Sequence, residues 1–341
     1  MMMMMMMTMA SSRTHAIDRA RVRRKATGDV RTHAKSVAIV GASSLTGRLV
    51  SGLASARVAA FDAIAVVHTN DKAWNEDAFG MPQEMIEKRM NASVEALMRC
   101  QEVREDDANG SATAVKASDV VVVAHESGER CLHAVKTLIS ENVRKDARVV
   151  MLSRVGVNRR SEKPFAEQNG RRRAGVKVGD VTLAIGKEIP GSVGALDAFA
   201  EAESALAKAS SERGFAVAVV RSGQLRGNGP LLLADLSARL VDNLYDVKYQ
   251  DVYVKGGDQS EGYSKRLNVA AVVAHLAEFE ATAARVKDVE VLSVVTKTNF
   301  FGEQTLTPPT DRERRKGYDM AKGRAPPAVD SATIERLLAD V

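Results

Sequence analysis

The chain has little cysteine and no apolar run long enough to cross a membrane. Its 341 residues include only Cys100 and Cys131, in no metal-type spacing, and its six histidines are scattered. We therefore expect no metal site, and two buried or half-buried thiols in a reducing compartment. No apolar run reaches the roughly 18 residues of a membrane-spanning helix. We expect no membrane span.

Outside its N-terminal segment the chain carries no excess of charge of either sign. Residues 1–36 hold eight basic side chains against Asp18 and Asp29, a net charge of +6 that equals the net charge of the whole chain. The remainder is therefore neutral overall. The basic isoelectric point gives no reason to expect nucleic-acid binding by the folded part.

The leader, residues 1–35, is rich in Arg, Ser, Thr and Ala, poor in acids, and opens with the methionine run Met1–Met7. It lacks the continuous apolar segment of a secretory signal, so we interpret it as an organellar transit peptide. We expect a chloroplast location, with the mitochondrion as the alternative. A disordered basic tail or a misassigned start codon would be a simpler explanation of the same composition.

The segment Ser36–Val50, SVAIVGASSLTGRLV, carries the most informative motif. An apolar β-type run, Val37–Val40, enters a turn with Gly41 and Gly47 and continues as a helical pattern. A parallel strand, a tight turn and a helix N-terminus in this order bind the pyrophosphate of a dinucleotide. Ser44 replaces the middle glycine of the motif, and a purely structural turn is the alternative.

Cofactor choice usually depends on an acid at the end of the second strand, which holds the ribose diol of NAD. The segment Val67–Asn70 has no acid there. Arg48 and Lys72 offer positive charge for a 2′-phosphate, which favours NADP over NAD, although both could be ordinary surface residues. The candidate cofactor-binding residues are Gly41, Ser43, Ser44, Leu45, Thr46, Gly47, Arg48, His68, Ala124 and Ser153.

Six further β-rich runs alternate with Ala-rich helical patterns. Such alternation predicts an α/β fold with a doubly wound, mostly parallel Rossmann sheet. The run Val120–Ala124 is apolar throughout, as is typical of a central parallel strand. The predicted strands are Ala63–His68, Asp119–Ala124, Arg148–Ser153, Phe215–Arg221, Asp251–Val254 and Val289–Thr296, and the clearest predicted helices are Glu129–Glu141 and Leu196–Arg213.

Other regions are less regular. Another strand is expected between His68 and Asp119, yet Gln83–Arg104 has the pattern of a charged helix and Glu105–Ser111 that of a polar loop. The segment Gly175–Gly194 indicates a hairpin. We divide the chain into the leader (1–35), a dinucleotide-binding domain (36–300) with a small C-terminal substrate or partner lobe (about 222–300), and a flexible tail (301–341) with a short helix at Ala332–Ala339.

Several segments follow one another in an order typical of a known family: VAIVGASSLTGRLV, SDVVVVAHESG, RVVMLSRVGV and AEAESALAKASSERGFAVAVVRSGQLRG. In this order they resemble the atypical short-chain dehydrogenase/reductase family, in its NmrA-like NAD(P)-binding branch of plants and algae. The resemblance runs from about Ser36 to about Thr296. It implies a Rossmann fold, an NAD(P) cofactor, and relatives in plastids that assist photosystem assembly or protein import.

Active short-chain enzymes use a tyrosine as general acid, a lysine four residues later, and a serine on the preceding loop. The resemblance places Ser153 at the serine's position. The tyrosine and lysine should follow on the helix near Gly194–Glu203, and that segment contains neither. Ser153 is therefore a weak catalytic candidate, better interpreted as a hydrogen-bond donor.

Three functions remain open. The first is an organellar NAD(P)-binding protein with a regulatory or assembly role, a protein partner and little catalysis. The second is an NADP-dependent oxidoreductase or isomerase acting on a small molecule with another proton donor. The third is a Rossmann scaffold without nucleotide. Candidate donors for the second function are Tyr245, Tyr249, Tyr253, Tyr263 and Lys265.

Overall fold

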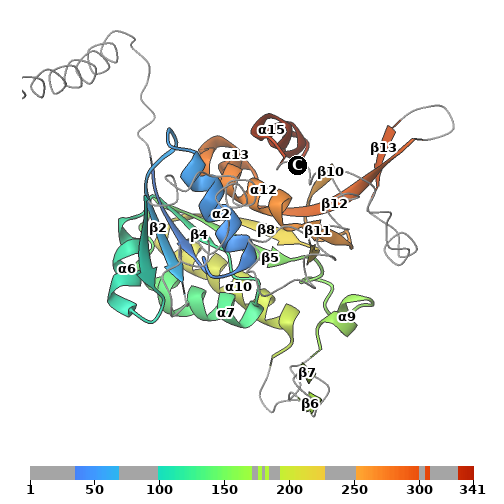
Figure 1. Ribbon diagram of the computed structural model, residues 1–341, viewed down its shortest axis with the longest axis horizontal. Helices are drawn as coiled ribbons and strands as arrows, with labels where there is room; N and C mark the ends of the chain where they lie inside the picture. The colour runs from blue at the N-terminus through green and yellow to red at the C-terminus, as the bar shows by residue number, and fades with distance from the viewer. Residues whose placement is uncertain are drawn as a thin grey trace, which may run out of the picture. The chain divides into compact units, whose positions relative to one another are not determined.

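A nine-stranded sheet forms the centre of the part of the chain that the structure describes (Figure 1). The computed structural model describes residues 35–68, 99–170, 176–178, 181–183, 193–226, 251–298, 304–307 and 329–341. The strand order is β10-β12-β8-β5-β4-β1-β2-β3, with β13 paired to β12. The strands are β1 (Lys35–Val40), β2 (Phe61–His68), β3 (Cys100–Arg104), β4 (Val120–Val123), β5 (Arg148–Arg154), β8 (Ala216–Ser222), β10 (Asp251–Gly256), β12 (Asp288–Thr298) and β13 (Gln304–Thr307).

The sheet is parallel from β3 across to β12, and only β10 and β13 pair with β12 in the antiparallel sense. The chain winds outward from β1 in one direction to β2 and β3, then returns to β4 on the other side of β1. This reversal makes the carboxyl ends of β1 and β4 a topological switch point, where ligands of open α/β sheets bind. The predicted α/β fold with a doubly wound, mostly parallel Rossmann sheet is confirmed.

Helices cover both faces of the sheet, as Figure 1 shows. Along β1, Val37 and Ile39 point into one apolar core while Ala38 and Val40 point into the other. A strand buried on both faces gains from apolar residues at every position, which explains the unbroken valines of β4. The first core contains α2 (Leu45–Ala56), α12 (Arg266–Glu278), α13 (Glu280–Arg285) and α15 (Ser331–Ala339); the second contains α6 (Ala108–Ala117), α7 (Gly128–Ala134), a π-helical turn (Val135–Ile139) and α10 (Ala195–Arg213), with α8 (Ser140–Asn142) ending the π-turn.

The strand expected between His68 and Asp119 is β3, so the helical interpretation of Gln83–Arg104 is wrong for Cys100–Arg104. The rest of that segment lies outside the described residues. β3 is an edge strand that buries only Val103 fully, so its sequence CQEVR carries almost no apolar signal. The polar loop predicted at Glu105–Ser111 is also too long, because Asp107 caps α6 and the helix begins at Ala108.

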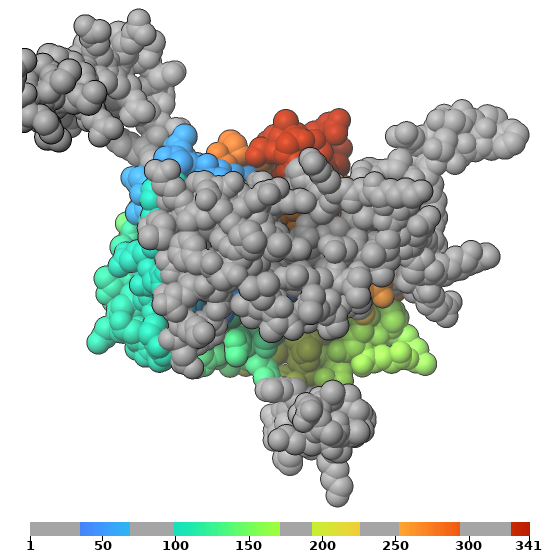
Figure 2. All heavy atoms as spheres, in the orientation of Figure 1, coloured from blue at the N-terminus to red at the C-terminus, as the bar shows by residue number. Residues whose placement is uncertain are grey.

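The smaller elements follow the predictions more closely. The hairpin expected within Gly175–Gly194 is present as β6 (Val176–Val178) and β7 (Val181–Leu183). The short helix expected at Ala332–Ala339 is α15. Figure 2 shows it, in red, on the molecular surface beside the orange α13, to which Thr282 joins it by a hydrogen bond to Glu335. The remaining elements are α9 (Phe165–Gln168), β9 (Gln224–Arg226) and β11 (Tyr263–Lys265).

Two predicted absences concern only the described residues. Among them, no helix has the length and apolar character to span a membrane. They also hold no group of three or more side chains suited to a metal ion. The expected burial of the two thiols is confirmed: Cys100 is half-buried and Cys131 is fully buried, and burial raises the pKa of Cys131 to about 12.

Candidate functional site

The turn after β1 has the backbone geometry that its glycines predict. Gly41 has a φ of 84°, and its amide and that of Ala42 both donate to the carbonyl of Val67 at 3.1 and 3.0 Å. A Cβ on Gly47 would lie 2.3 Å from the carbonyl oxygen of Gly41. Glycine at both positions therefore allows the first turn of α2 to pack against the end of β1.

Ser44, which replaces the middle glycine of the motif, is the N-cap of α2. Its hydroxyl oxygen accepts a hydrogen bond from the Gly47 amide at 2.8 Å and donates to the carbonyl of Ala124 at 2.6 Å. The first bond satisfies one amide of the helix N-terminus, and the second ties the turn to the loop after β4. The Ser44 hydroxyl thus makes both of these hydrogen bonds within the protein.

A second amide of this helix N-terminus, that of Thr46, is bound by a carboxylate from the loop after β4. Oε1 of Glu126 accepts from the Thr46 amide at 2.9 Å and from the Thr46 hydroxyl at 2.7 Å. The guanidinium of Arg266, at the start of α12, donates to both carboxylate oxygens at 3.1 and 3.2 Å. Burial alone would raise the pKa of Glu126, but Arg266 and Thr46 together lower it, so the carboxylate is ionised at neutral pH.

The space over Gly41 is filled by the neighbouring side chain of that loop. A Cβ on Gly41 would lie 2.8 Å from the ring of His125, whose side chain is 3% exposed. Nε2 of His125 in turn lies 3.2 Å from Oε1 of Glu105, at the end of β3. With Glu126 bonded to the Thr46 amide and to Arg266, the donors that a dinucleotide pyrophosphate would use at the switch point are occupied in this arrangement.

His68 and Arg48 lie where the adenosine end of a dinucleotide would reach in a Rossmann fold. Both side chains are buried, so the alternative of ordinary surface residues is wrong for Arg48. Burial lowers the pKa of His68, Glu102 at 3.8 Å opposes this, and the charges of Arg104 and Arg48 lower it further. Charges of both signs are thus present near the end of β2, with Arg48 and Arg104 beside Glu102 and Asp106. Lys72 lies outside the described residues.

Ser153 lies on β5, on the far side of β4 from the strand that leads into this turn, and is fully buried. Its hydroxyl donates to Oε1 of Glu203 on α10 at 2.5 Å. Glu203 is held in turn by Arg221 on β8, through contacts of 3.1 and 2.7 Å. Ser153, Arg221 and Glu290 stand at equivalent positions on the adjacent strands β5, β8 and β12. Ser153 therefore belongs to a buried polar row across the sheet.

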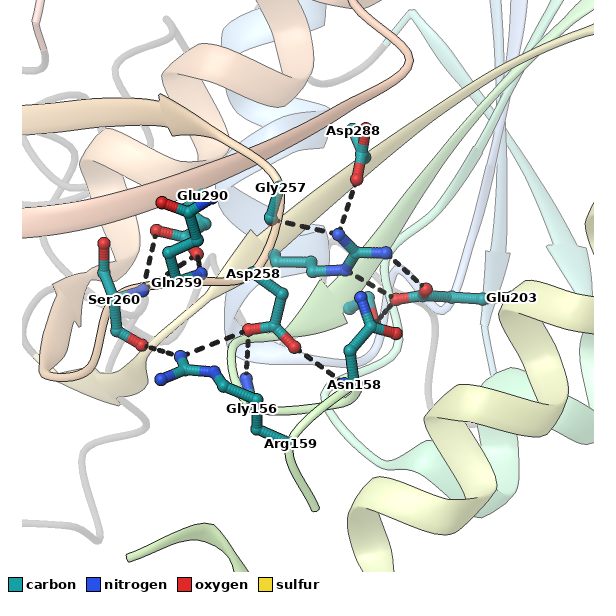
Figure 3. A network of polar contacts seen from close by, with 12 residues as sticks. Gly156, Asn158, Arg159, Glu203, Gly257, Asp258, Gln259, Ser260, Asp288 and Glu290 are labelled. Atoms are coloured by element: carbon teal, nitrogen blue, oxygen red, sulfur yellow. Dashed lines mark hydrogen bonds and ion pairs between the residues drawn. The ribbon is translucent and has the colours of Figure 1, made fainter. Parts of the chain in front are cut away.

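Figure 3 shows the loop that this row holds in place, residues 257–260. Arg221 donates to the carbonyl of Gly257 at 3.0 Å and to Asp288 at 2.7 Å, which with Glu203 raises its pKa against the effect of burial. The carboxylate of Asp258 accepts from the amides of Gly156 and Asn158 at 2.6 and 2.7 Å. The charged groups of Arg221 and Asp258 thus find their partners within the protein, which indicates a structural role for this network.

The same loop has two further anchors. Arg159 lies 3.5 Å from Asp258 and donates to the carbonyl of Ser260. Glu290, which is fully buried, accepts from the amides of Gln259 and Ser260. A buried carboxylate that accepts backbone amides fixes a loop strongly, because leaving those groups unpaired would be costly.

A cavity of about 450 Å³ lies at the carboxyl ends of β4 and β5. Glu126 forms part of its wall, and so stands between this cavity and the turn after β1. Ser153 does not line it. Residues of both charges and an apolar side face the space: Glu126, Glu129, Arg130, Arg154, Leu196 and Phe199.

The structure brings most of the predicted cofactor-binding residues together and leaves one apart. The turn from Gly41 to Arg48, the end of β2 at His68 and the residue after β4, Ala124, converge at the switch point. Ser153 does not join them. The sequence interpretation missed His125, Glu126 and Arg266. The polar pair His125 and Glu126 directly after the run Val120–Ala124 was the available signal, since side chains at the carboxyl end of a central strand face the site.

Strand order and site together define a Rossmann-type α/β protein. No protein-family model matches the chain, and no curated protein matches it. Solved structures of similar shape include a wide-type short-chain dehydrogenase/reductase from Veillonella parvula in complex with NADP (17% identity, 76% of this chain, 95% of that chain, TM-score 0.45). Others are a Rossmann-fold NAD(P)-binding family protein from Shigella flexneri (13%, 79%, 100%, 0.44) and vestitone reductase from alfalfa (9%, 89%, 92%, 0.45). The fold assignment rests on the strand order itself.

Proposed function

We propose that this chain is an organellar Rossmann protein with a regulatory or assembly role and little catalysis. The observation that carries the proposal is the state of Ser153, whose hydroxyl is buried and bonded to a glutamate that an arginine already holds. In that state it has no access to a substrate. The segment Gly194–Glu203 offers no tyrosine or lysine beside it.

Three of the other possible proton donors in the later half are poorly placed for hydride-transfer chemistry: Lys208, Lys265 and Tyr253. The lysine of α10, Lys208, is on the exposed side of the helix beside Glu212, at 3.9 Å. Lys265 is fully buried, and Tyr253 packs against the core on β10. Tyr245 and Tyr249 lie outside the described residues. These placements favour a binding role over an oxidoreductase or isomerase.

Turnover of NADPH with the full chain tests the proposal. We expect no oxidation above background across a panel of carbonyl and enone substrates, and no effect of Ser153→Ala on that rate. Steady NADPH oxidation that a Tyr253→Phe or Tyr263→Phe substitution abolishes would contradict the proposal and support the enzyme alternative. A rate of NADPH oxidation at background level in the wild type and in both tyrosine variants supports the proposal.

For the ligand, we propose a dinucleotide, NADP rather than NAD. The support is the glycine turn at a switch point and the buried Arg48 near His68, with no acid at the end of β2. The second candidate function, a scaffold without nucleotide, is favoured by Glu126 and His125 at the turn. Calorimetric titration with NADPH and NADH separates the two.

The organellar location rests on composition. Residues 1–35 are basic and rich in hydroxyl residues, as transit peptides are. We propose the chloroplast, with the mitochondrion as the alternative. A fluorescent protein carrying residues 1–35 should enter the organelle, and the same fusion with Arg21, Arg23 and Arg24 replaced by glutamate should not. A diffuse signal from the first fusion would contradict this location.

A further inference from the structure

The carboxylate of Glu126 has the surroundings that a phosphate would have at this turn. It accepts from a backbone amide of the first turn of α2, from the hydroxyl of Thr46 and from the guanidinium of Arg266. A helix N-terminus attracts an anion because its amides are unpaired and its dipole is positive there. The first turn of α2 has no acid of its own, so Glu126 supplies that anion from the loop after β4.

The partner of Glu126 comes from a third part of the chain. Arg266 begins α12 and lies 140 residues beyond Glu126 in sequence, and its side chain is 15% exposed. Together the three segments place one negative and one positive charge at the switch point. A phosphate in the position of Glu126 would meet the same amide, the same hydroxyl and the same guanidinium. The two anions therefore compete for a single set of donors.

The loop that carries Glu126 is firmly attached to the turn. Ala124 donates its amide to Val40 at 2.8 Å and accepts the hydroxyl of Ser44 at 2.6 Å, while His125 lies against Gly41. The side chain of Glu126 is 22% exposed and lines the cavity at the carboxyl ends of β4 and β5, so it has space to move away from its donors. Displacement of this side chain is a smaller change than movement of the loop.

From these contacts we infer that Glu126 is an internal competitor for the phosphate position of the turn. It holds the switch point closed, and a dinucleotide gains the Thr46 amide and Arg266 only when this carboxylate leaves. The inference deepens the ligand part of the proposed function and rests on it. The wild-type chain then binds dinucleotides weakly. The donors for a phosphate are still present, but Glu126 occupies them.

The test compares dinucleotide affinity with and without the carboxylate, in the full chain, by isothermal titration calorimetry with NADPH. We expect Glu126→Ala to bind at least tenfold more tightly than wild type, which corresponds to about 1.4 kcal/mol. Glu126→Gln, which keeps the shape without the charge, should lie in between and serves if the alanine variant does not fold. Glu141→Gln removes a charge from an exposed site on α8 and should bind as wild type does.

Two further ligands, ADP and adenosine, show whether the gain in affinity comes from the phosphate groups. The tighter binding of Glu126→Ala should appear with ADP as well as NADPH, and should be missing with adenosine, which has no phosphate. An equal gain for adenosine, or equal NADPH affinity of wild type and folded Glu126→Ala, would overturn the inference while leaving the proposed ligand in place. No binding of NADPH by any folded variant would overturn the inference and leave the scaffold. NADPH turnover bears only on the proposed lack of catalysis.

Discussion

Arg148, at the start of β5, donates a hydrogen bond to the carbonyl oxygen of Leu276, 2.8 Å away near the end of α12. The same guanidinium nitrogen lies 3.4 Å from the carbonyl of Ala277. The last carbonyls of a helix have no partner within the helix, so a buried helix end needs an external donor. Arg148 provides it from the sheet, and burial lowers its pKa while Glu280 opposes that shift.

Replacing this donor should destabilise the fold. We expect Arg148→Met to lower the free energy of unfolding by about 2 kcal/mol, because it leaves buried carbonyls unpaired. Arg144→Met is the matched control, since Arg144 forms a half-exposed pair with Asp119 and should cost less than about 1 kcal/mol. Urea denaturation followed by circular dichroism measures both. Equal losses in the two variants would contradict the capping role.

The buried pair of Arg221 and Glu203 should show strong coupling. We expect Arg221→Met and Glu203→Gln each to cost about 3 kcal/mol, because each leaves a buried partner without its counter-charge. The double variant should cost less than the sum. The exposed pair Lys208 and Glu212 provides the control cycle, with coupling near zero. Additive losses at Arg221 and Glu203 would show that the pair does not act as a unit.

The turn after β1 should not tolerate a side chain at its first glycine. Gly41→Ala places a Cβ 2.8 Å from His125 at a φ of 84°, and we expect a loss of at least about 1 kcal/mol from the backbone conformation alone. Gly170→Ala is the control, because the nearest atom to its Cβ would be 3.7 Å away. Thermal unfolding should separate the two variants. Equal melting temperatures would contradict the expected backbone strain at position 41.

The burial of His275 beside α15 should make the stability of the fold depend on pH. Nε2 of His275 lies 2.8 Å from Oε2 of Glu335, and burial lowers the pKa of His275, with Glu335 opposing it. Of the other charges around the ring, Arg57 lowers this pKa and Glu278 raises it.

Since the folded-state pKa lies below the unfolded value of about 6.5, the unfolded chain binds the proton more readily. The contribution of His275 to stability is therefore complete above about pH 6.5 and is lost as the pH falls below it. The free energy of unfolding should drop between about pH 7.5 and pH 5.5 in wild type and drop less in His275→Gln. The exposed His133→Gln should behave as wild type does. Parallel curves for wild type and His275→Gln would contradict the assignment.

Much of the fold could be predicted because its signals are local. The strand β4 and the centre of β5 are buried on both faces and appear as unbroken apolar runs, and α10 shows its length in an uninterrupted Ala-rich pattern. The edge strand β3 could not be recognised, since it buries one residue fully and leaves the others polar. A helix pattern and a one-sided edge strand are hard to separate over five residues.

The sequence predicted where the site lies but not which side chains occupy it. The glycines identified the turn, because a positive φ and a close backbone approach leave few alternatives to glycine. The role of Ser153 depended on Glu203, which is 50 residues away, and on Arg221. No pattern in the neighbourhood of Ser153 reports that its hydroxyl is already bonded.

The amino-acid sequence by itself determined the central strands, the long helix α10 and the glycine turn, since burial and backbone conformation constrain each residue where it stands. The tertiary structure alone decided what lies at that turn. Thr46 and Glu126 are 80 residues apart, and they meet because β1 and β4 pair side by side and bring their carboxyl ends together. A contact made by strand pairing leaves no local trace, so only the folded chain shows that a carboxylate faces the amides of α2.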